Sequence, residues 1–215
     1  MTPGGVIFDC DGVIVDSEYP TFQLLAQEFA AHGLPLTPDQ IAQDFTGGTM
    51  AGVADMARAK GADLPANWVP MFYERLYAHL ALGTALVPGI LEVLDLLDAQ
   101  AIPFAVGSNG SDHKMQVTLG QHPGLIARFH GRLFSSQTLG KPKPAPDVYL
   151  HAARALGVAP ARCVVVEDSP TGAGAARAAG MRCMGYAAAG HADGLRAAGA
   201  VIFHDMAELP GLLAL

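Results

Sequence analysis

Two aspartates that directly follow a short apolar run are the residues best suited to chemistry in this chain. Asp9 and Asp11 come after Val6–Phe8, a run typical of a buried β-strand. Because side chains alternate along a strand, residues i and i+2 share a face, and a turn at Gly12 can direct both carboxylates into one crevice. One carboxylate of such a pair can attack an electrophile while the other moves protons. An ordinary acidic turn would show the same residue types.

The aspartate pair does not fit a calcium-binding EF-hand loop. Such a loop also begins with Asp-x-Asp, but it needs an oxygen ligand at its fifth position and glycine at its sixth. Val13 and Ile14 occupy those positions here. The apolar residues 13–15 instead predict that the chain continues in extended β structure.

The composition is that of a globular protein with enough apolar material for a core. The chain has 215 residues, 51% of them hydrophobic, which suits one domain or one domain with a modest insert. A net charge of −7 disfavours nucleic acid or an anionic membrane as the main partner. A small anionic substrate remains compatible with that charge, because a few placed cations or a metal ion can hold it locally.

Targeting signals and cysteine usage both favour a cytoplasmic protein. We find no signal-peptide pattern and no long apolar span, so neither secretion nor insertion into a membrane is expected. The three cysteines have no CxxC spacing and lie in or beside predicted strands, which predicts buried, reduced thiols. The eight histidines show no i, i+4 pair, which disfavours a zinc site.

The order of apolar patterns predicts an α/β fold with a mostly parallel, Rossmann-type sheet. After the first strand, short β-rich runs alternate with helical patterns, and this alternation is typical of βαβ units whose sheet is covered on both faces. Two predicted helices carry the apolar stripes Ile90, Val93, Leu94, Leu97 and Val148, Ala152, Ala155, Leu156. The predicted strands lie near residues 102–107, 131–135, 163–167, 181–186 and 200–203.

Residues 17–84 interrupt the alternation with four consecutive helical patterns. We therefore predict a core domain formed by residues 1–16 and 85–215, and a helical cap domain formed by residues 17–84. The insert leaves the predicted sheet just after the aspartate pair, so it could act as a lid. Its loop around Thr46, Gly47 and Met50 is the candidate for substrate selectivity.

Ser108 and Asn109 follow a predicted strand and precede a helix that opens near Asp112. A hydroxyl, an amide and backbone N–H groups at a helix N-terminus can form a phosphate cradle. The same residues would also suit a simple turn or an N-cap.

The segment 140–147 holds two lysines among prolines that stiffen the chain before a helix. A fixed ammonium group there can balance the charge of phosphate and carboxylate groups, although a solvated basic loop would look the same. Lys141 and Lys143 are both candidates for this role.

Glu167 and Asp168 end the strongly apolar run 163–166. Parallel strands present their carboxyl ends at one edge of a sheet, so these acids are expected near the aspartate pair. Mg²⁺ prefers oxygen ligands and retains several waters, and Asp9, a backbone carbonyl near Asp11, and Asp168 supply a suitable set. Alternatively, an acid here could simply compensate the dipole at the N-terminus of the following helix. That role explains one acidic residue more easily than two.

Taken in order, the segments DCDGV, VGSN, KPAPD and VVEDS resemble the four signature motifs of the haloacid dehalogenase superfamily of phosphotransferases. The likeness spans essentially the whole chain, with residues 17–84 similar to the small α-helical cap of the superfamily. It implies a Mg²⁺-dependent enzyme acting on a small phosphorylated metabolite, and a monomer is common in the family.

The resemblance also implies a role for each motif residue. Asp9 is the expected nucleophile, Asp11 the general acid and base, and Ser108 the phosphate ligand, with Gly12 and Asn109 beside it. Lys143, which begins KPAPD, is the expected charge-balancing cation, with Lys141 in reserve. Asp9, Asp11 and Asp168 are the expected metal ligands, and Glu167 supports the metal. These roles require Asp9 to stay ionised beside the cation and Asp11 to carry a proton.

Within the superfamily, the residues favour a phosphatase. Dehalogenases lack the second acid of the first motif, which is present here as Asp11. The sugar phosphomutases related to β-phosphoglucomutase carry a histidine and an arginine where this chain has Pro20 and Met50. The segments around Ser108 and Phe134 are similar to bacterial sugar-phosphate phosphatases of the 6-phosphogluconate phosphatase type. A phosphomutase is the alternative enzyme, and a non-catalytic binding protein is the alternative from another class.

Overall fold

The computed structural model describes residues 2–45, 49–188 and 190–215, which fold into two compact units. One unit combines Met1–Val15 with Leu86–Leu215, and the other is Asp16–Ala85. The chain passes from one unit to the other twice, at β2 (Val15–Asp16) and at β3 (Ala85–Leu86). These two short strands pair in a two-stranded sheet.

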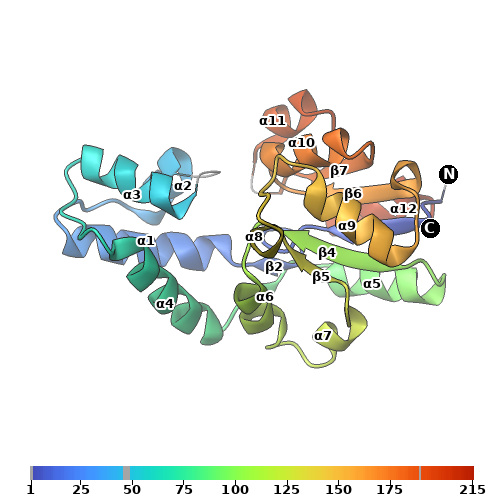
Figure 1. The fold of residues 1–215 in the computed structure, drawn as a ribbon, viewed down its shortest axis with the longest axis horizontal. Helices are drawn as coiled ribbons and strands as arrows, with labels where there is room; N and C mark the ends of the chain where they lie inside the picture. The colour runs from blue at the N-terminus through green and yellow to red at the C-terminus, as the bar shows by residue number, and fades with distance from the viewer. Residues whose placement is uncertain (1, 46–48, 189) are drawn as a thin grey trace. The chain divides into compact units, whose positions relative to one another are not determined.

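The larger unit is built on a parallel sheet (Figure 1). In the described residues its six strands have the order β5-β4-β1-β6-β7-β8. The strands are β1 (Gly5–Phe8), β4 (Phe104–Ser108), β5 (Leu133–Ser135), β6 (Cys163–Glu167), β7 (Arg182–Tyr186) and β8 (Val201–Phe203). β1 lies in the middle, where Ile7 pairs with Ala105 on one side and with Val165 on the other. The predicted α/β class with a parallel sheet is confirmed.

Helices cover both faces of this sheet because its central strands are apolar on both sides. Val6 and Phe8 face a core that includes α5 (Ile90–Ala99), whereas Ile7 faces the opposite core with α9 (Asp147–Leu156) and α10 (Pro170–Ala178). The other helices of this unit are α6 (Asp112–Leu119), α7 (Leu125–Arg128), α8 (Ser136–Leu139), α11 (Ala192–Ala197) and α12 (Leu209–Leu213), with 3₁₀ turns at Pro160–Arg162 and Met206–Glu208.

Two local expectations are wrong. Residues 13 and 14 form a turn rather than a strand, closed by a hydrogen bond from Ile14 N to the Cys10 carbonyl, so their apolar side chains are buried without belonging to a sheet. In α9 the stripe is shifted, because Ala155 is exposed whereas Tyr149 and Ala153 are buried. The three cysteines are buried and form no disulfide.

The smaller unit consists of four helices in the part that is described. They are α1 (Glu18–Ala31), α2 (Pro38–Phe45), α3 (Met50–Ala59) and α4 (Trp68–Ala81). Aromatic packing forms its centre: Phe29 lies against Trp68, and Trp68 stacks on Phe72 with 4.7 Å between ring centroids. Pro20 is tolerated inside α1 because it lies in the first turn, where a missing N–H costs little.

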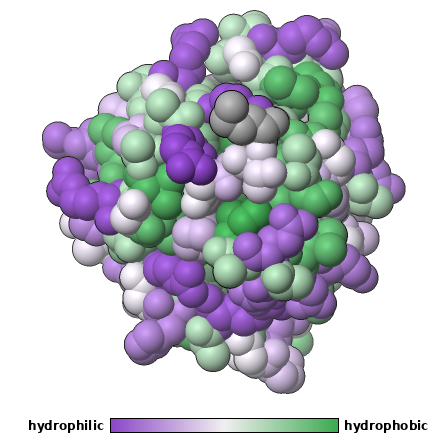
Figure 2. Space-filling model, turned by 90° about the vertical axis from the view of Figure 1, so that its right-hand side faces the viewer, coloured by the Kyte–Doolittle hydropathy of each residue, from purple (hydrophilic) through white to green (hydrophobic). Residues whose placement is uncertain are grey.

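Of the helices in the described ranges, none has both the length and the apolar character to span a bilayer. On the face drawn in Figure 2, hydrophilic and hydrophobic residues are interspersed.

Candidate active site at the carboxyl edge of the sheet

The ends of three neighbouring strands bring the acidic and polar motif residues together. Asp9 follows β1, Ser108 ends β4 and Glu167 ends β6, and these strands are adjacent and parallel. Their carboxyl ends therefore lie at one edge of the sheet, where ligands of open α/β sheets bind. The backbone ties Asp9 to β6, because its N–H donates to the Val166 carbonyl at 2.9 Å.

Lys143 is the cation of this cluster. Its Nζ lies 2.9 Å from Asp9 Oδ1 and 2.7 Å from Glu167 Oε1, and its side chain is only 2% exposed. The ammonium also lies over the Tyr149 ring, 4.8 Å from the centroid. Burial alone would lower the pKa of Lys143, but Asp9 and Glu167 outweigh that effect and raise it, so the side chain is charged at neutral pH.

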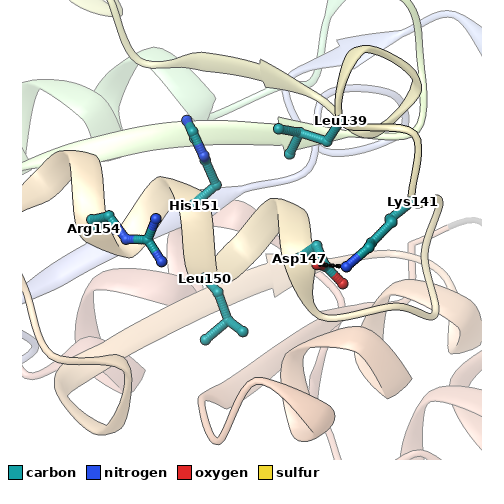
Figure 3. A pocket seen from close by; sticks show the side chains of 6 residues that line it. All are labelled: Leu139, Lys141, Asp147, Leu150, His151 and Arg154. Atoms are coloured by element: carbon teal, nitrogen blue, oxygen red, sulfur yellow. Dashed lines mark hydrogen bonds and ion pairs between the residues drawn. The ribbon is translucent and has the colours of Figure 1, made fainter.

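Lys141 lies elsewhere, in the connection between α8 and α9. Its Nζ pairs with Asp147 Oδ1 at 2.8 Å, and its side chain is 63% exposed. Figure 3 shows this pair at the start of α9, beside a hollow of about 220 Å³ that Leu150, His151 and Arg154 also line. None of the acids of the cluster lines this hollow. Of the two lysines left open by the sequence, the geometry therefore favours Lys143.

Glu167 is fully buried and receives four hydrogen bonds. Oε1 accepts from Lys143 Nζ at 2.7 Å and from the Tyr149 hydroxyl at 2.6 Å. Oε2 accepts from the N–H and the hydroxyl of Ser169, at 3.0 and 2.9 Å. Burial would raise the pKa of Glu167, but Lys143 and these donors outweigh it and lower the pKa. Glu167 is thus an ionised anchor that fixes Lys143 in place.

Asp9 has the opposite electrostatic balance. Burial raises its pKa to about 7; Lys143 opposes this rise, whereas the carboxylates of Glu167 and Asp11 add to it. Lys143 alone therefore does not offset the burial of a charged Asp9. A nucleophilic carboxylate here needs additional positive charge to be fully ionised at neutral pH.

The acids of this cluster fit a hard cation. Asp9, Glu167 and Asp168 each offer an oxygen, and these oxygens lie within 4.8 Å of one another. All the donors are carboxylates, the ligand type that Mg²⁺ prefers. Gly12 makes room for one of them: its φ is +72°, and a Cβ there would overlap the Asp168 carboxylate. Because Glu167 already has four protein donors, Asp9 and Asp168 are the better placed ligands.

Asp11 is paired with a residue that the sequence did not single out as functional. Lys114 Nζ, from α6, lies 2.8 Å from Asp11 Oδ1. Burial would lower the pKa of Lys114, but Asp11 outweighs that effect and raises it. An ion pair therefore connects the loop of Asp11, in the first motif, to α6, the helix that follows the second motif.

Ser108 and Asn109 organise the loop after β4. The Ser108 hydroxyl accepts a hydrogen bond from Gly110 N at 2.9 Å. Asn109 Oδ1 accepts from the Ser136 hydroxyl at 2.7 Å and from Lys143 N at 2.9 Å. The Asn109 side chain thus joins the segments that follow β4 and β5 to the lysine loop. The sequence predicted a phosphate contact for Asn109 but not this positioning role.

The residues predicted for selectivity lie in the smaller unit or outside the described chain. Thr46 and Gly47 fall outside the described residues. Met50 is the first residue of α3, and Thr49 caps that helix by accepting a hydrogen bond from Gly52 N at 3.2 Å.

Comparison with known proteins identifies the family. The family model described as haloacid dehalogenase-like hydrolase matches residues 4–180. The chain belongs to the haloacid dehalogenase-like hydrolases. It is 30% identical to the 6-phosphogluconate phosphatase of Escherichia coli (strain K12), over 96% of this chain and 93% of that protein.

Solved haloacid dehalogenase-like structures show the same fold. A conserved protein of unknown function from Agrobacterium tumefaciens is 34% identical, with a TM-score of 0.87 over 97% of this chain and 96% of that one. A family hydrolase from Deinococcus radiodurans R1, with bound phosphate and sodium, is 35% identical, with a TM-score of 0.84 over 99% of this chain and 96% of that one. The resemblance found in the four motifs is confirmed, as is the assignment to hydrolytic enzymes.

The roles of several residues in this haloacid dehalogenase-like hydrolase site were not predicted from the sequence. Ser136 follows β5 at the same edge of the sheet, so the rule that parallel strands share a carboxyl edge could have found it. In the sequence, Tyr149 helped only to choose Lys143 as the lysine of the third motif. Its hydrogen bond to Glu167 depends on the side-chain packing of α9. Lys114 is three residues into a helix, and nothing in its spacing indicates Asp11 as a partner.

Proposed function

We propose that this hydrolase is a Mg²⁺-dependent phosphatase that removes phosphate from a small phosphorylated sugar or sugar acid through an aspartyl-phosphate intermediate. The observation that carries the proposal is the Asp9 carboxylate at the end of β1, ion-paired with buried Lys143 and clustered with the Asp168 carboxylate. Two relatives support it, one named a 6-phosphogluconate phosphatase and one solved with phosphate bound.

The reaction divides into two steps at Asp9. In the first, an Asp9 oxygen attacks phosphorus while the ester P–O bond breaks, and Asp11 gives its proton to the departing alkoxide. In the second, Asp11 takes a proton from water as that water attacks the aspartyl phosphate. Inorganic phosphate leaves, and Asp9 is again a carboxylate.

The surrounding residues hold the transferring group. Lys143 places a buried positive charge beside the Asp9 oxygen, and Ser108 lies at the end of the adjacent strand with the turn of Asn109 and Gly110 beyond it. Asp9 and Asp168 would hold Mg²⁺, with the Asp11 backbone carbonyl and Glu167 supporting it. When bound, the ion supplies positive charge that stabilises the charge developing on the phosphoryl oxygens.

We further propose that the smaller helical unit acts as the cap and that its segment around residues 46–50 contributes to selectivity. The presence of Met50 and Pro20, in place of the arginine and histidine of the mutases, favours water as the phosphoryl acceptor. Substitution of Met50 by Arg should change KM values across a substrate series more than it changes kcat with an unselective aryl phosphate.

A phosphate-release assay tests the proposal. The purified protein is incubated with Mg²⁺ and a panel of phosphorylated sugars, polyols and sugar acids, with Asp9→Asn as the blank. Release that disappears in the variant and with a chelator is the expected result. Isomerised sugar phosphate after priming with a bisphosphate, without net release, would instead establish a mutase. If neither phosphate release nor isomerisation were observed, a non-catalytic binding protein would be the better description.

A further inference from the structure

The ion pair between Lys114 and Asp11 is a contact within the site that the proposed chemistry does not yet use. Lys114 Nζ lies 2.8 Å from Asp11 Oδ1, and the two side chains are 17% and 23% exposed. Lys143 contacts Asp9 and Glu167 and does not take part in this pair. The site therefore has two lysines from different elements, each beside a different aspartate of the first motif.

Local structure fixes where Lys114 can reach. The chain leaves β4 at Ser108, turns at Gly110, and begins α6 after Ser111, whose hydroxyl caps the helix by accepting from Lys114 N at 3.1 Å. This cap sets the first turn of α6, from which the Lys114 side chain extends to Asp11. The ammonium is thus carried by an ordered helix start and not by a free loop.

The other carboxylate oxygen of Asp11, Oδ2, lies close to Gly110. A Cβ at Gly110 would be 3.5 Å from Asp11 Oδ2, 3.2 Å from Ser108 Oγ and 3.5 Å from Lys114 Cδ. Asp11 is therefore located between the Lys114 ammonium at Oδ1 and the backbone of Gly110 near Oδ2. This location puts the carboxylate beside the turn that the proposed function assigns to the phosphate.

We propose that Lys114 is a positioning residue that holds the Asp11 side chain beside Gly110 and Ser108. Asp11 is ionised in this ion pair, so it takes up a proton before the first step, transfers it to the leaving oxygen, and takes another from the attacking water. This inference rests on the proposed function, in which Asp11 is the proton donor. A carboxylate that loses its ammonium partner gains rotamer freedom, and a displacement of about 1 Å at a reacting group can cost roughly 100-fold in rate.

The leaving group distinguishes positioning from a general structural defect. An alkyl phosphate releases a poor leaving group that needs a proton, whereas p-nitrophenyl phosphate releases a stable phenolate that needs little help. The ratio kcat/KM reports the steps up to formation of the aspartyl phosphate. We expect Lys114→Met to lower kcat/KM roughly 10- to 100-fold for the best alkyl phosphate of the panel, and less than about threefold for p-nitrophenyl phosphate.

Two further variants complete the test. Lys114→Arg keeps the positive charge and should recover most of the alkyl phosphate activity. Lys141→Met removes a lysine whose carboxylate partner is also 2.8 Å away but whose pair is exposed on α9, and it should leave both substrates unaffected. A crystal structure of the Lys114→Met protein should show the Asp11 carboxylate turned away from Gly110.

Equal losses for the two substrates, or no loss for either, would overturn the inference. An unmoved Asp11 in the variant structure would also overturn it, whether or not the protein is active. If wild-type protein releases no phosphate from any ester, the proposed function fails, and the structure of the variant then decides on its own whether Lys114 positions Asp11. If wild type is active and the variant shows no leaving-group dependence, only the inference about Lys114 fails.

Discussion

Lys141 and Lys143 lie two residues apart, yet they belong to different regions of the molecule. The Lys141 ammonium pairs with Asp147 at 2.8 Å on the surface of α9, and the Lys143 ammonium meets Glu167 and Asp9 at 2.7 and 2.9 Å inside the acidic cluster. The distances are nearly the same. What differs is burial, since the Lys141 side chain is 63% exposed and that of Lys143 is 2% exposed.

The comparison teaches that contact distance does not rank these interactions. Water screens the exposed pair, so the pair contributes little to stability. In the cluster, each buried charge depends on its neighbours, and removal of one partner leaves the others uncompensated. The following predictions test this difference, from the largest expected effect to the smallest.

Lys143→Met should cause the largest loss. It removes the ammonium beside Asp9 and leaves Glu167 buried without its cation, so we expect phosphate release to fall roughly 10²- to 10³-fold or more. The rate is measured per folded molecule, with thermal unfolding recorded alongside because the variant is also expected to be less stable. If the variant kept its activity within a factor of a few of wild type, the loss of buried Lys143 would matter as little as the loss of a surface ion pair, and the contrast would fail.

Gly172→Ala tests how closely α10 approaches the anchor carboxylate. A Cβ at this position would overlap Glu167, so the carboxylate must move, and we expect a loss of about 1–3 kcal/mol in the free energy of unfolding. The matched control is Gly211→Ala in α12, where a Cβ would meet no atom within 4 Å. Chemical denaturation of both variants gives the comparison, and the control should be neutral or slightly stabilised. Equal stability of the two would contradict the packing described for Glu167.

The raised pKa of Asp9 predicts a dependence of Mg²⁺ binding on pH. The folded-state pKa of about 7 lies above its ordinary value of 3.8, so without a cation Asp9 favours the folded state at low pH and loses that contribution as the pH rises through 7. Mg²⁺ must displace a proton at pH 6 but not at pH 8. We therefore expect Mg²⁺, at roughly ten times its Kd at pH 8, to stabilise the protein by about 1 kcal/mol more at pH 8 than at pH 6.

Thermal unfolding with and without Mg²⁺ at the two pH values measures this difference. In Asp9→Asn the pH dependence should largely disappear, because the titrating group is gone. A wild-type stabilisation that is the same at pH 6 and pH 8 would show that Asp9 does not compete with protons for the ion.

Lys141→Met should have the smallest effect. The exposed pair with Asp147 contributes little, so we expect no measurable change in unfolding free energy and no change in phosphate release. A double-mutant cycle with Asp147→Asn measures the pair directly. A coupling energy as large as that of a buried pair would remove the contrast between the two lysines.

The sequence was sufficient for those parts of the molecule that depend on periodicity and strand order. The alternation of apolar runs and helical stripes predicted the parallel sheet, and four helical patterns in residues 17–84 correspond to α1–α4. The edge rule for parallel strands explained why residues as distant as Asp9 and Glu167 should meet, and their oxygens do lie in one cluster.

The parts that could not be predicted depend on side-chain packing. The sequence predicted a metal-supporting role for Glu167 and gave no sign of its four donors, which come from the lysine loop, α9 and the start of α10. Only the packing of these elements makes Glu167 an anchor for Lys143. The pairing of Lys114 with Asp11 likewise depends on the helix cap that orients α6. The turn at residues 13 and 14 was missed because burial, and not strand formation, accounts for the apolar residues there.

The central position of β1 also has a consequence for synthesis of the chain. This strand precedes both of its neighbours in the sequence, so one edge stays unpaired until β4 has been made and the other until β6 has been made. An apolar strand with open edges is a template for pairing with other chains, and sheets built from such distant partners form slowly. The strand that leads to Asp9 is therefore open to pairing with other chains until both of its neighbours have been made.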